Sequence, residues 1–229
     1  MSDEGDWIVR SEPLTEQVYR YLKTSILSGR LVPGEKLVET KLAASLQISR
    51  SPVREAMRML TVEQLLVVEN GTVSVFTPTL DDFRQVYELR VAIESKACET
   101  AAMHFDVAHQ AAFDKNLAET AIAVRQGNAD RLIELNSEFH ALILQISGNL
   151  RFQKIMFDVS TLIHFYWRWV LAVNSLQTNI LAEHEAVYEA LVSGDGSLAA
   201  RQMTQHIQKD LRVIESAYLD REREGKIHA

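Results

Sequence analysis

The stretch that decides the fold of this chain is residues 48–60, Ile-Ser-Arg-Ser-Pro-Val-Arg-Glu-Ala-Met-Arg-Met-Leu. Its apolar residues recur at helical spacing, and Pro52 suits the first turn of a helix, where its missing N–H costs nothing. Arg50 and Arg54 stand near the start of this helix, although positive charge there opposes the helix dipole. The pattern predicts a DNA-recognition helix. An amphipathic helix with a charged, solvated face would have a similar pattern.

The residues at the helix start have the chemistry of DNA contacts. Arginine can bind guanine O6 and N7 in the major groove, and both Arg50 and Arg54 can reach the duplex from this end. Ser49 and Ser51 can donate hydroxyl groups to phosphate, and the first backbone amides of the helix favour the same anion.

The elements expected around this helix have the order of a winged helix-turn-helix. Apolar periodicity predicts helices over residues 14–28 and 39–46. Further along, two short β-prone runs flank Asn70-Gly71, a pair that favours the type I′ turn of a hairpin. Three helices followed by a hairpin predict a DNA-binding domain over residues 14–77.

The rest of the chain is expected to be helical. Residues 78–81 form a linker, and no proline occurs beyond Pro78. Glycine, serine and asparagine separate predicted helices at residues 81–104, 107–125, 130–146, 152–173, 178–192 and 197–221. The fold class is therefore mainly α: a winged helix-turn-helix joined to an all-α antiparallel bundle over residues 82–229, with residues 1–13 as a flexible arm.

Composition divides the chain by charge. The apolar fraction of 47% is ordinary for a globular protein, and no run approaches the roughly 20 apolar residues of a membrane-spanning helix, so no membrane partner is expected. The net charge of −7 combines +2 over residues 14–79, −6 over residues 80–229 and −3 in the arm, which suits a DNA reader joined to an acidic sensor. The single cysteine, Cys98, cannot form an intrachain disulfide, and we expect it to be buried in a cytoplasmic protein.

Three segments of the N-terminal domain follow a longer pattern: Pro-Gly at 33–34, LVETKLA at 37–43 and SRSPVREAM at 49–57. In their order and spacing they resemble the GntR family of bacterial regulators. The resemblance implies that Arg50 and Arg54 contact the bases or phosphates of operator DNA. Members often carry an arginine where this chain has Thr40 and Lys41, so the operator contacts of these two residues are expected to differ. Gln64 stands where a glycine is common before the wing.

All seven histidines follow the linker. Asn136 and His140 are four residues apart and share one helix face. His184 and His206 belong to two later predicted helices, so three imidazoles from three helices can converge in the bundle and bind a divalent metal. Spacing does not establish this convergence, and each histidine can equally be a core or surface residue.

The segments around these histidines also follow a pattern: Asn136-x-x-Phe139-His140, then Glu183-His184 and His206. They resemble the FCD effector-binding domain of FadR-type GntR regulators, over nearly all of residues 81–211. The resemblance implies a divalent metal, with zinc, nickel and manganese as candidates, held by an aspartate and three histidines at the positions of Asn136, His140, His184 and His206. Asn136 departs from this pattern, because an amide oxygen is neutral and a poorer ligand than a carboxylate.

The effector is expected to be a small carboxylic acid, such as a hydroxy acid or sugar acid. A metal with neutral ligands keeps nearly its full +2 charge and attracts an anion. Arg90 can clamp a carboxylate as a second cation, or it can form a surface ion pair with Glu94, four residues along. Residues 164–169 are rich in aromatic side chains; one face must be core, and the other can bring His164 or Arg168 to the effector.

These patterns predict a ligand-responsive transcriptional regulator, with repression as the default sign, that binds a palindromic operator as a homodimer. Two other classes of protein stay open. One is a metal hydrolase built on the three histidines, which we do not expect because no HExxH or other paired base-and-ligand motif occurs. The other is an architectural DNA binder without an effector.

Overall fold

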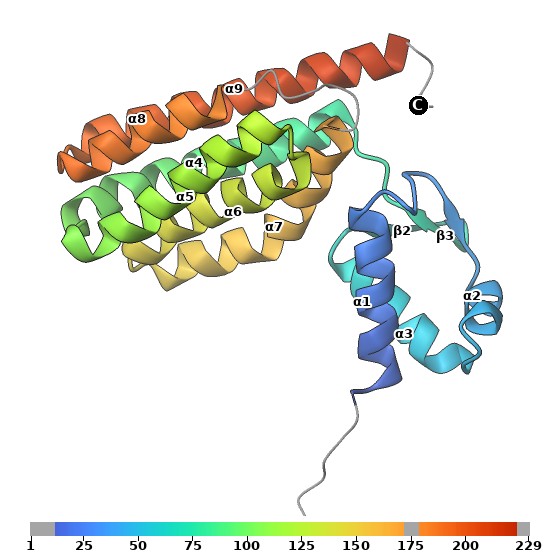
Figure 1. The fold of residues 1–229 in the computed structure, drawn as a ribbon. Coiled ribbons are helices and arrows are strands. Elements are labelled where there is room, and N and C mark those ends of the chain that lie inside the picture. Colours follow the sequence, from blue (N-terminus) through green and yellow to red (C-terminus); the bar gives the residue numbers. More distant parts are fainter. Residues whose placement is uncertain (1–11, 172–178, 224–229) are drawn as a thin grey trace, which may run out of the picture. The chain divides into compact units, whose positions relative to one another are not determined.

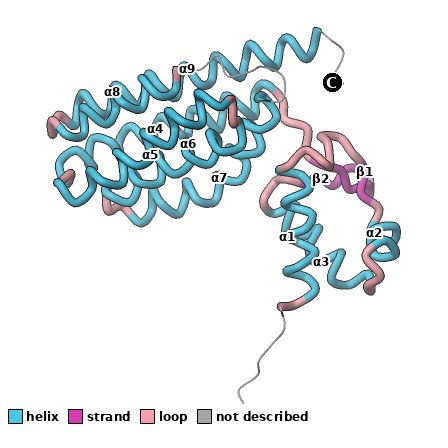
Figure 2. Tube along the Cα trace, viewed as in Figure 1, coloured by secondary structure: helices cyan, strands magenta, loops and turns pink. Residues whose placement is uncertain are grey.

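The computed structural model describes residues 12–171 and 179–223, which form two compact units divided between Thr77 and Pro78 (Figure 1). The expected flexible arm, residues 1–13, lies almost entirely outside the described residues. Helices dominate both units, and the only sheet among the described residues is a small one in the first unit (Figure 2). The mainly α fold class predicted from the sequence is confirmed.

The N-terminal unit has the elements of a winged helix-turn-helix. Three helices pack beside a small antiparallel sheet with strand order β1-β3-β2. Its elements are α1 (Leu14–Leu27), β1 (Lys36–Leu37), α2 (Glu39–Ser45), α3 (Arg50–Val62), β2 (Leu66–Glu69) and β3 (Thr72–Val75). The sequence pattern does not predict β1, because two residues are too few for an alternation to be recognised. Its pairing with β3 forms only in the folded unit.

Helices α1 and α3 build the core of this unit. Both carry apolar side chains at helical spacing, and each of these is at most 5% exposed: Val18, Leu22, Ile26, Val53, Met57 and Leu60. Fully burying one aliphatic side chain stabilises a fold by about 1.5–3 kcal/mol, so this face anchors α3 firmly. The polar face of α3 is left outward.

The predicted hairpin is confirmed. Strands β2 and β3 pair from Glu69 opposite Thr72, with Asn70 and Gly71 as a two-residue turn. Both turn residues have positive φ, 50° and 75°, as a type I′ turn requires. Gln64 also has a positive φ, 60°, just before the wing, which explains why glycine suits that position.

The C-terminal unit is a helical bundle, and its helices follow the predicted ranges to within two residues at each described end. They are α4 (Leu80–His104), α5 (Val107–Gln126), α6 (Ala129–Ile146), α7 (Leu150–Leu171), α8 (Ile180–Val192) and α9 (Gly196–Arg223). The expected α7 end at residue 173 and α8 start at residue 178 lie outside the described residues. Thr79 and Asp82 form a capping box, so α4 begins at Leu80, inside the range expected for the linker.

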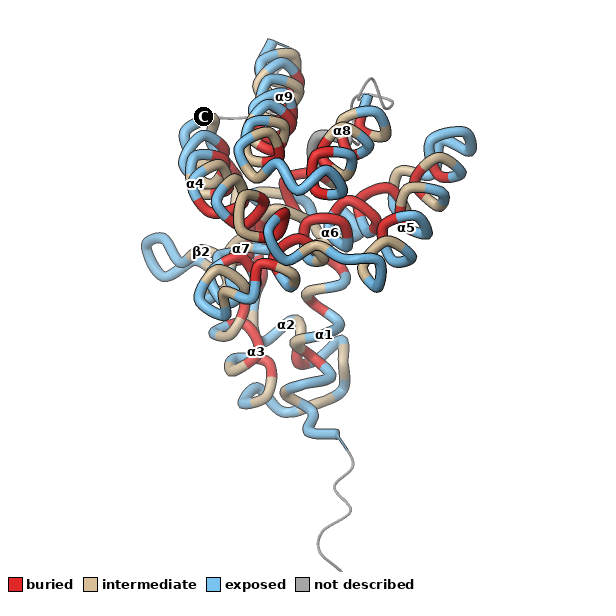
Figure 3. Tube along the Cα trace, turned by 90° about the vertical axis from the view of Figure 1, so that its left-hand side faces the viewer, coloured by how far each residue is buried: buried red, intermediate tan, exposed pale blue. Residues whose placement is uncertain are grey.

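Helix α4 is central to the bundle, since it packs against α6, α7, α8 and α9. Buried residues lie on the inner faces of these helices (Figure 3). Most are apolar, and Cys98 is among them, as expected. Several charged or polar side chains are buried as well, and these form the site described below: Arg90, Glu94, Asn136, His140, His184, His206 and Asp210. No helix in the described residues is long and apolar enough to cross a membrane.

Candidate functional site

The six residues predicted to bind DNA are all exposed, on α2 and at the start of α3: Thr40, Lys41, Ser49, Arg50, Ser51 and Arg54. Ser49 is the N-cap residue of α3, but its hydroxyl makes no capping hydrogen bond. The first amides of α3 are therefore not satisfied by this side chain, and such amides favour phosphate.

Arg54 has a partner that the sequence pattern does not reveal. Its Nε and Nη2 donate to the two carboxylate oxygens of Glu39, at 2.9 and 2.7 Å. Glu39 is the first residue of α2, fifteen positions earlier in the chain. Hydrogen bonds from Arg54, together with the charges of Arg54 and Arg50, lower the pKa of Glu39. Glu39 therefore holds one of the two predicted DNA-reading arginines in a defined orientation.

The three histidines predicted to bind metal converge inside the bundle. His140 on α6, His184 on α8 and His206 on α9 each offer one ring nitrogen, and these nitrogens lie within 4.8 Å of one another. All three side chains are buried, with at most 7% exposed. The ring of His184 stacks on Phe139, with 3.9 Å between centroids, which holds it in place.

Two carboxylates fix the orientation of two of these rings. Glu94 hydrogen-bonds Nδ1 of His140, and Glu183 hydrogen-bonds Nδ1 of His206 at 2.9 Å. Burial alone would raise the pKa of Glu94, but the charges and hydrogen bonds of His140 and Arg90 outweigh it and lower that pKa to about 2. Burial lowers the pKa of His140 to about 4. At neutral pH the Nδ1–H of a neutral His140 thus donates a hydrogen bond to an ionised Glu94.

This arrangement leaves the Nε2 lone pairs facing each other. Nε2 of His140 and Nε2 of His206 are 3.2 Å apart. Nitrogens that share one metal ion at about 2.1 Å lie about 3–4 Å apart, so the separation suits a common ion. Carboxylates on the far ring nitrogens are the usual partners of metal-binding histidines.

Further atoms at the cluster lack hydrogen bonds. Within the described part of the chain, both ring nitrogens of His184 and Oδ1 of Asn136 are buried without a hydrogen-bond partner. Burial lowers the pKa of His184 well below its usual value, so its ring is neutral. Buried polar groups normally find partners, and neutral imidazoles are metal ligands. The residues present therefore fit a divalent metal, and Asn136 lines the same cavity as His140.

Arg90 is not the surface ion pair that its spacing also allowed. Its side chain is 2% exposed, its Nε donates to Glu94 at 2.8 Å, and its Nη1 lies 3.7 Å from Oδ2 of Asp210. Burial raises the pKa of Asp210, although His206 and Arg90 oppose this. The ionised Glu94 already balances the charge of Arg90, and Glu183 and Asp210 bring two more carboxyl groups to the cluster, so the buried site has no positive excess of its own.

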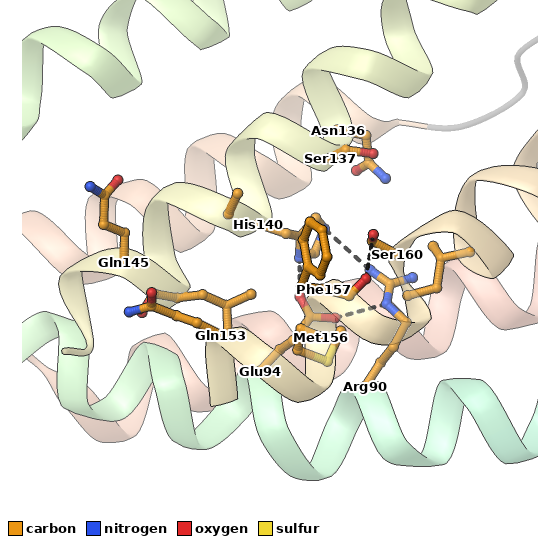
Figure 4. A pocket seen from close by; sticks show the side chains of 13 residues that line it. Arg90, Glu94, Asn136, Ser137, His140, Gln145, Gln153, Met156, Phe157 and Ser160 are labelled. Atoms are coloured by element: carbon orange, nitrogen blue, oxygen red, sulfur yellow. Dashed lines mark hydrogen bonds and ion pairs between the residues drawn. The ribbon is translucent and has the colours of Figure 1, made fainter. Parts of the chain in front are cut away.

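A cavity of about 450 Å³ lies beside the cluster, between α4, α6 and α7. Arg90, Glu94 and His140 lie together at one part of its wall, and Gln145 and Gln153 lie apart from them (Figure 4). Apolar side chains complete the wall, among them Leu144, Met156, Phe157 and Ile163.

His164 and Arg168 do not line this cavity. Arg168 instead forms an ion pair with Asp130 of α6. These two α7 residues share the helix face of Phe157, seven and eleven positions later, but they lie beyond Ile163, the last residue of α7 that lines the cavity. We therefore leave His164 and Arg168 out of the proposed effector site.

The chain matches two protein-family models, the FCD domain over residues 85–209 and the bacterial regulatory proteins of the gntR family over residues 14–75. The chain belongs to the GntR family of transcriptional regulators, and it carries an FCD domain. The family predicted from the sequence is confirmed.

Curated relatives of this GntR regulator match over most of its length. The uncharacterised HTH-type transcriptional regulator YdhC of Bacillus subtilis is 33% identical, over 86% of this chain and 89% of its own. The HTH-type transcriptional repressor RspR of Escherichia coli is 27% identical, over 87% and 88%. The gluconate operon transcriptional repressor of Bacillus subtilis is 23% identical, over 94% and 90%.

Solved structures agree in fold. McbR/YncC of Escherichia coli superposes with a TM-score of 0.74 at 21% identity, covering 91% of this chain and 100% of that one. The family and these relatives are transcriptional regulators and not enzymes, which removes the metal-hydrolase alternative.

Sequence reasoning missed the acidic residues of this GntR regulator's buried cluster. Glu183 precedes His184 in the chain but bonds to His206, and Asp210 was not singled out. One signal for Asp210 is present in the sequence: it follows His206 by four residues, as Glu94 follows Arg90 and His140 follows Asn136.

Proposed function

We propose that this GntR regulator is a homodimer whose affinity for a palindromic operator is controlled by a small carboxylate bound at a divalent metal centre. Residues 14–77 would read DNA, and residues 82–229 would bind the effector and form the dimer. The observation that carries the proposal is the pair of Nε2 atoms of His140 and His206, 3.2 Å apart, each in a ring whose Nδ1 is held by a carboxylate.

His140, His184 and His206 would hold the ion, with Asn136 as a weaker fourth contact. Zinc, nickel and manganese remain the candidates, since imidazole suits the first two and a site with oxygen ligands suits manganese. The ion would supply two positive charges to a cluster in which Glu94 already balances the charge of Arg90. Anion binding would therefore depend on the metal.

The cavity favours a carboxylate that also carries hydroxyl groups. Arg90 can clamp a carboxylate at one part of the wall. Gln145 and Gln153 offer hydrogen bonds farther along it, as a hydroxy acid or sugar acid requires (Figure 4). The name of the gluconate operon repressor is in keeping with this class and with repression as the default sign.

The small DNA-binding unit is a reason to propose a dimer. One recognition helix reads a few base pairs, so two helices related by a two-fold axis would read a palindrome. An effector that binds the non-operator geometry about 100-fold more tightly would supply about 2.7 kcal/mol per site against DNA binding.

The first experiment measures metal content and metal binding. Protein purified without added metal should contain close to one equivalent of a divalent ion by elemental analysis. After the ion is stripped with a chelator, calorimetry should show it rebinding. Finding no ion in the purified protein and no binding by calorimetry would remove the metal centre.

The second experiment tests the effector and the sign. Operator duplexes selected from a random pool should bind dimeric protein, and hydroxy or sugar acids should release them only when metal is present. Each acid is paired with its neutral amide as the matched control. Equal release by acid and amide, or release that survives metal removal, contradicts the proposal.

A further inference from the structure

The lone pair on Nε2 of His140 lies close both to Arg90 and to the position between the histidines that a metal ion would take. Nη2 of Arg90 lies 3.3 Å from Nε2 of His140, and the same Nε2 faces His206 at 3.2 Å (Figure 4 shows the contact with Arg90). Because Nδ1 of His140 is bonded to the Glu94 carboxylate, Nε2 is the ring atom left to accept a proton donor. Arg90, which is always charged, is the donor in this contact.

A neutral imidazole has a single lone pair, at Nε2 in this tautomer. That lone pair can accept an N–H from Arg90 or bind a metal ion, but not both. We propose that metal binding at His140 displaces Nη2 of Arg90 and so prepares Arg90 to bind the effector carboxylate. This inference rests on the metal centre proposed above.

The surroundings of Arg90 determine what the displaced group does next. Its Nε stays bonded to Glu94 at 2.8 Å, and its guanidinium lies over the ring of Tyr87, 4.8 Å from the centroid. These contacts keep the side chain in place on the cavity wall. Nη1 of Arg90 already lacks a hydrogen bond and lies 3.7 Å from Oδ2 of Asp210. Displacement from His140 therefore adds a second buried donor, and a carboxylate in the cavity can accept from it.

Arg90 thus has opposite effects on two ligands. Without metal it competes for His140, so it weakens metal binding. With metal in place Nη2 joins Nη1 as a donor without a hydrogen bond, so Arg90 strengthens carboxylate binding. A residue that served only to stabilise the fold would not oppose metal binding.

The first test uses metal alone, so no effector need be known. Ni²⁺ is titrated into metal-free wild type and Arg90→Met, which removes both the donor and the charge at similar length. Arg90→Met should bind Ni²⁺ at least about tenfold more tightly, the factor that a charge-assisted hydrogen bond is worth. Arg84→Met is the control: Arg84 is on the same helix, pairs with Glu215 and is 55% exposed. Unchanged or weaker binding by a folded Arg90→Met overturns the inference.

The second test keeps the wild-type protein, in case Arg90→Met does not fold. Zn²⁺ is titrated while the guanidinium N–H signals of Arg90 are followed by ¹⁵N NMR. The Nη signals should shift toward the values of a free N–H when zinc binds, and shift back when acetate is added. Zinc binding that leaves these signals unchanged overturns the inference while the metal centre stands. If the wild type binds neither Ni²⁺ nor Zn²⁺, the metal centre fails and this inference fails with it.

Discussion

Two arginine–glutamate pairs in this protein share their chemistry and differ in environment. Arg54 and Glu39 meet on the DNA-binding unit, where the Arg54 side chain is 70% exposed. Arg90 and Glu94 meet inside the bundle, where both side chains are 2% exposed. Their closest N–O distances are nearly equal, 2.7 and 2.8 Å. The closest distance therefore does not distinguish the two pairs, and burial does.

The difference decides what each arginine can do. Water and salt screen the exposed pair, so Arg54 can exchange Glu39 for a DNA phosphate or base at small cost. The buried pair has no water to replace a lost partner, so Arg90 can release a contact only when another buried ligand takes over. The first arrangement suits reversible binding to a long polyanion, and the second suits a site that responds to small ligands.

The largest effect should follow from breaking the buried pair. Glu94→Gln leaves Arg90 without its closest counter-charge, so the metal-free protein should lose about 3–5 kcal/mol of unfolding free energy. Urea denaturation measures this loss. The control is Glu99→Gln on the same helix, where the partner is Lys96 and the Glu99 side chain is 41% exposed. Equal urea midpoints for both variants would show that the burial of the pair does not matter.

The next effect concerns the histidines beside the buried pair. His206→Ala removes a proposed ligand and should lower metal affinity at least about 100-fold, or about 2.7 kcal/mol. Losing only a residue that hydrogen-bonds to a ligand already costs about 10- to 100-fold, so losing the ligand itself should cost more. Competition with a fluorescent chelator measures the affinity. His104→Ala, at the exposed end of α4, should bind metal like the wild type. Similar affinities for the two variants would remove His206 from the site.

A smaller effect is expected on the exposed side of the comparison. Arg50→Ala and Arg54→Ala should each weaken operator binding by about 1–3 kcal/mol and relax base preference if the arginine reads a base. Fluorescence anisotropy with operator and single-base variants measures both. Arg58→Ala, farther along α3 and paired with Glu55, is the control. Wild-type affinity in both Arg50 and Arg54 variants would contradict the recognition-helix assignment.

The smallest effect should come from the partner of Arg54. Glu39→Gln should leave thermal stability unchanged, because the pair is exposed. It should lower the ratio of operator affinity to random-duplex affinity. Arg54 loses its fixed orientation, which weakens operator binding, and a negative charge near DNA is removed, which strengthens binding to any duplex. Titrations of both duplexes at two salt concentrations check this. An unchanged ratio means that Glu39 does not orient Arg54 for DNA.

Most of the fold follows from patterns within single segments. Helix α3 and the Asn70-Gly71 hairpin depend on neighbours in the chain, and the structure confirms both elements. Strand β1 is missed because it exists only through pairing with β3. The Glu39–Arg54 pair is missed for a similar reason, since its partners belong to two helices and meet only when α2 packs on α3.

The buried site also contains residues that were predicted from the sequence and residues that were not. The residues 140, 184 and 206 were predicted, and the resemblance to the FCD domain carried that prediction, because helical spacing cannot show that three helices face one another. The roles of Glu183 and Asp210 were not predicted, and His164 and Arg168 do not line the cavity described above.

The sequence by itself determined the helix and turn positions, the exposed arginines at the start of α3 and the family, because periodicity, turn chemistry and motif order are properties of consecutive residues. Only the tertiary structure decided which side chains share the buried cluster and which protons they carry. Packing of α4, α6, α8 and α9 brings Arg90, Glu94 and the histidines together. Burial then keeps His140 neutral, while the charges and hydrogen bonds of His140 and Arg90 keep Glu94 ionised.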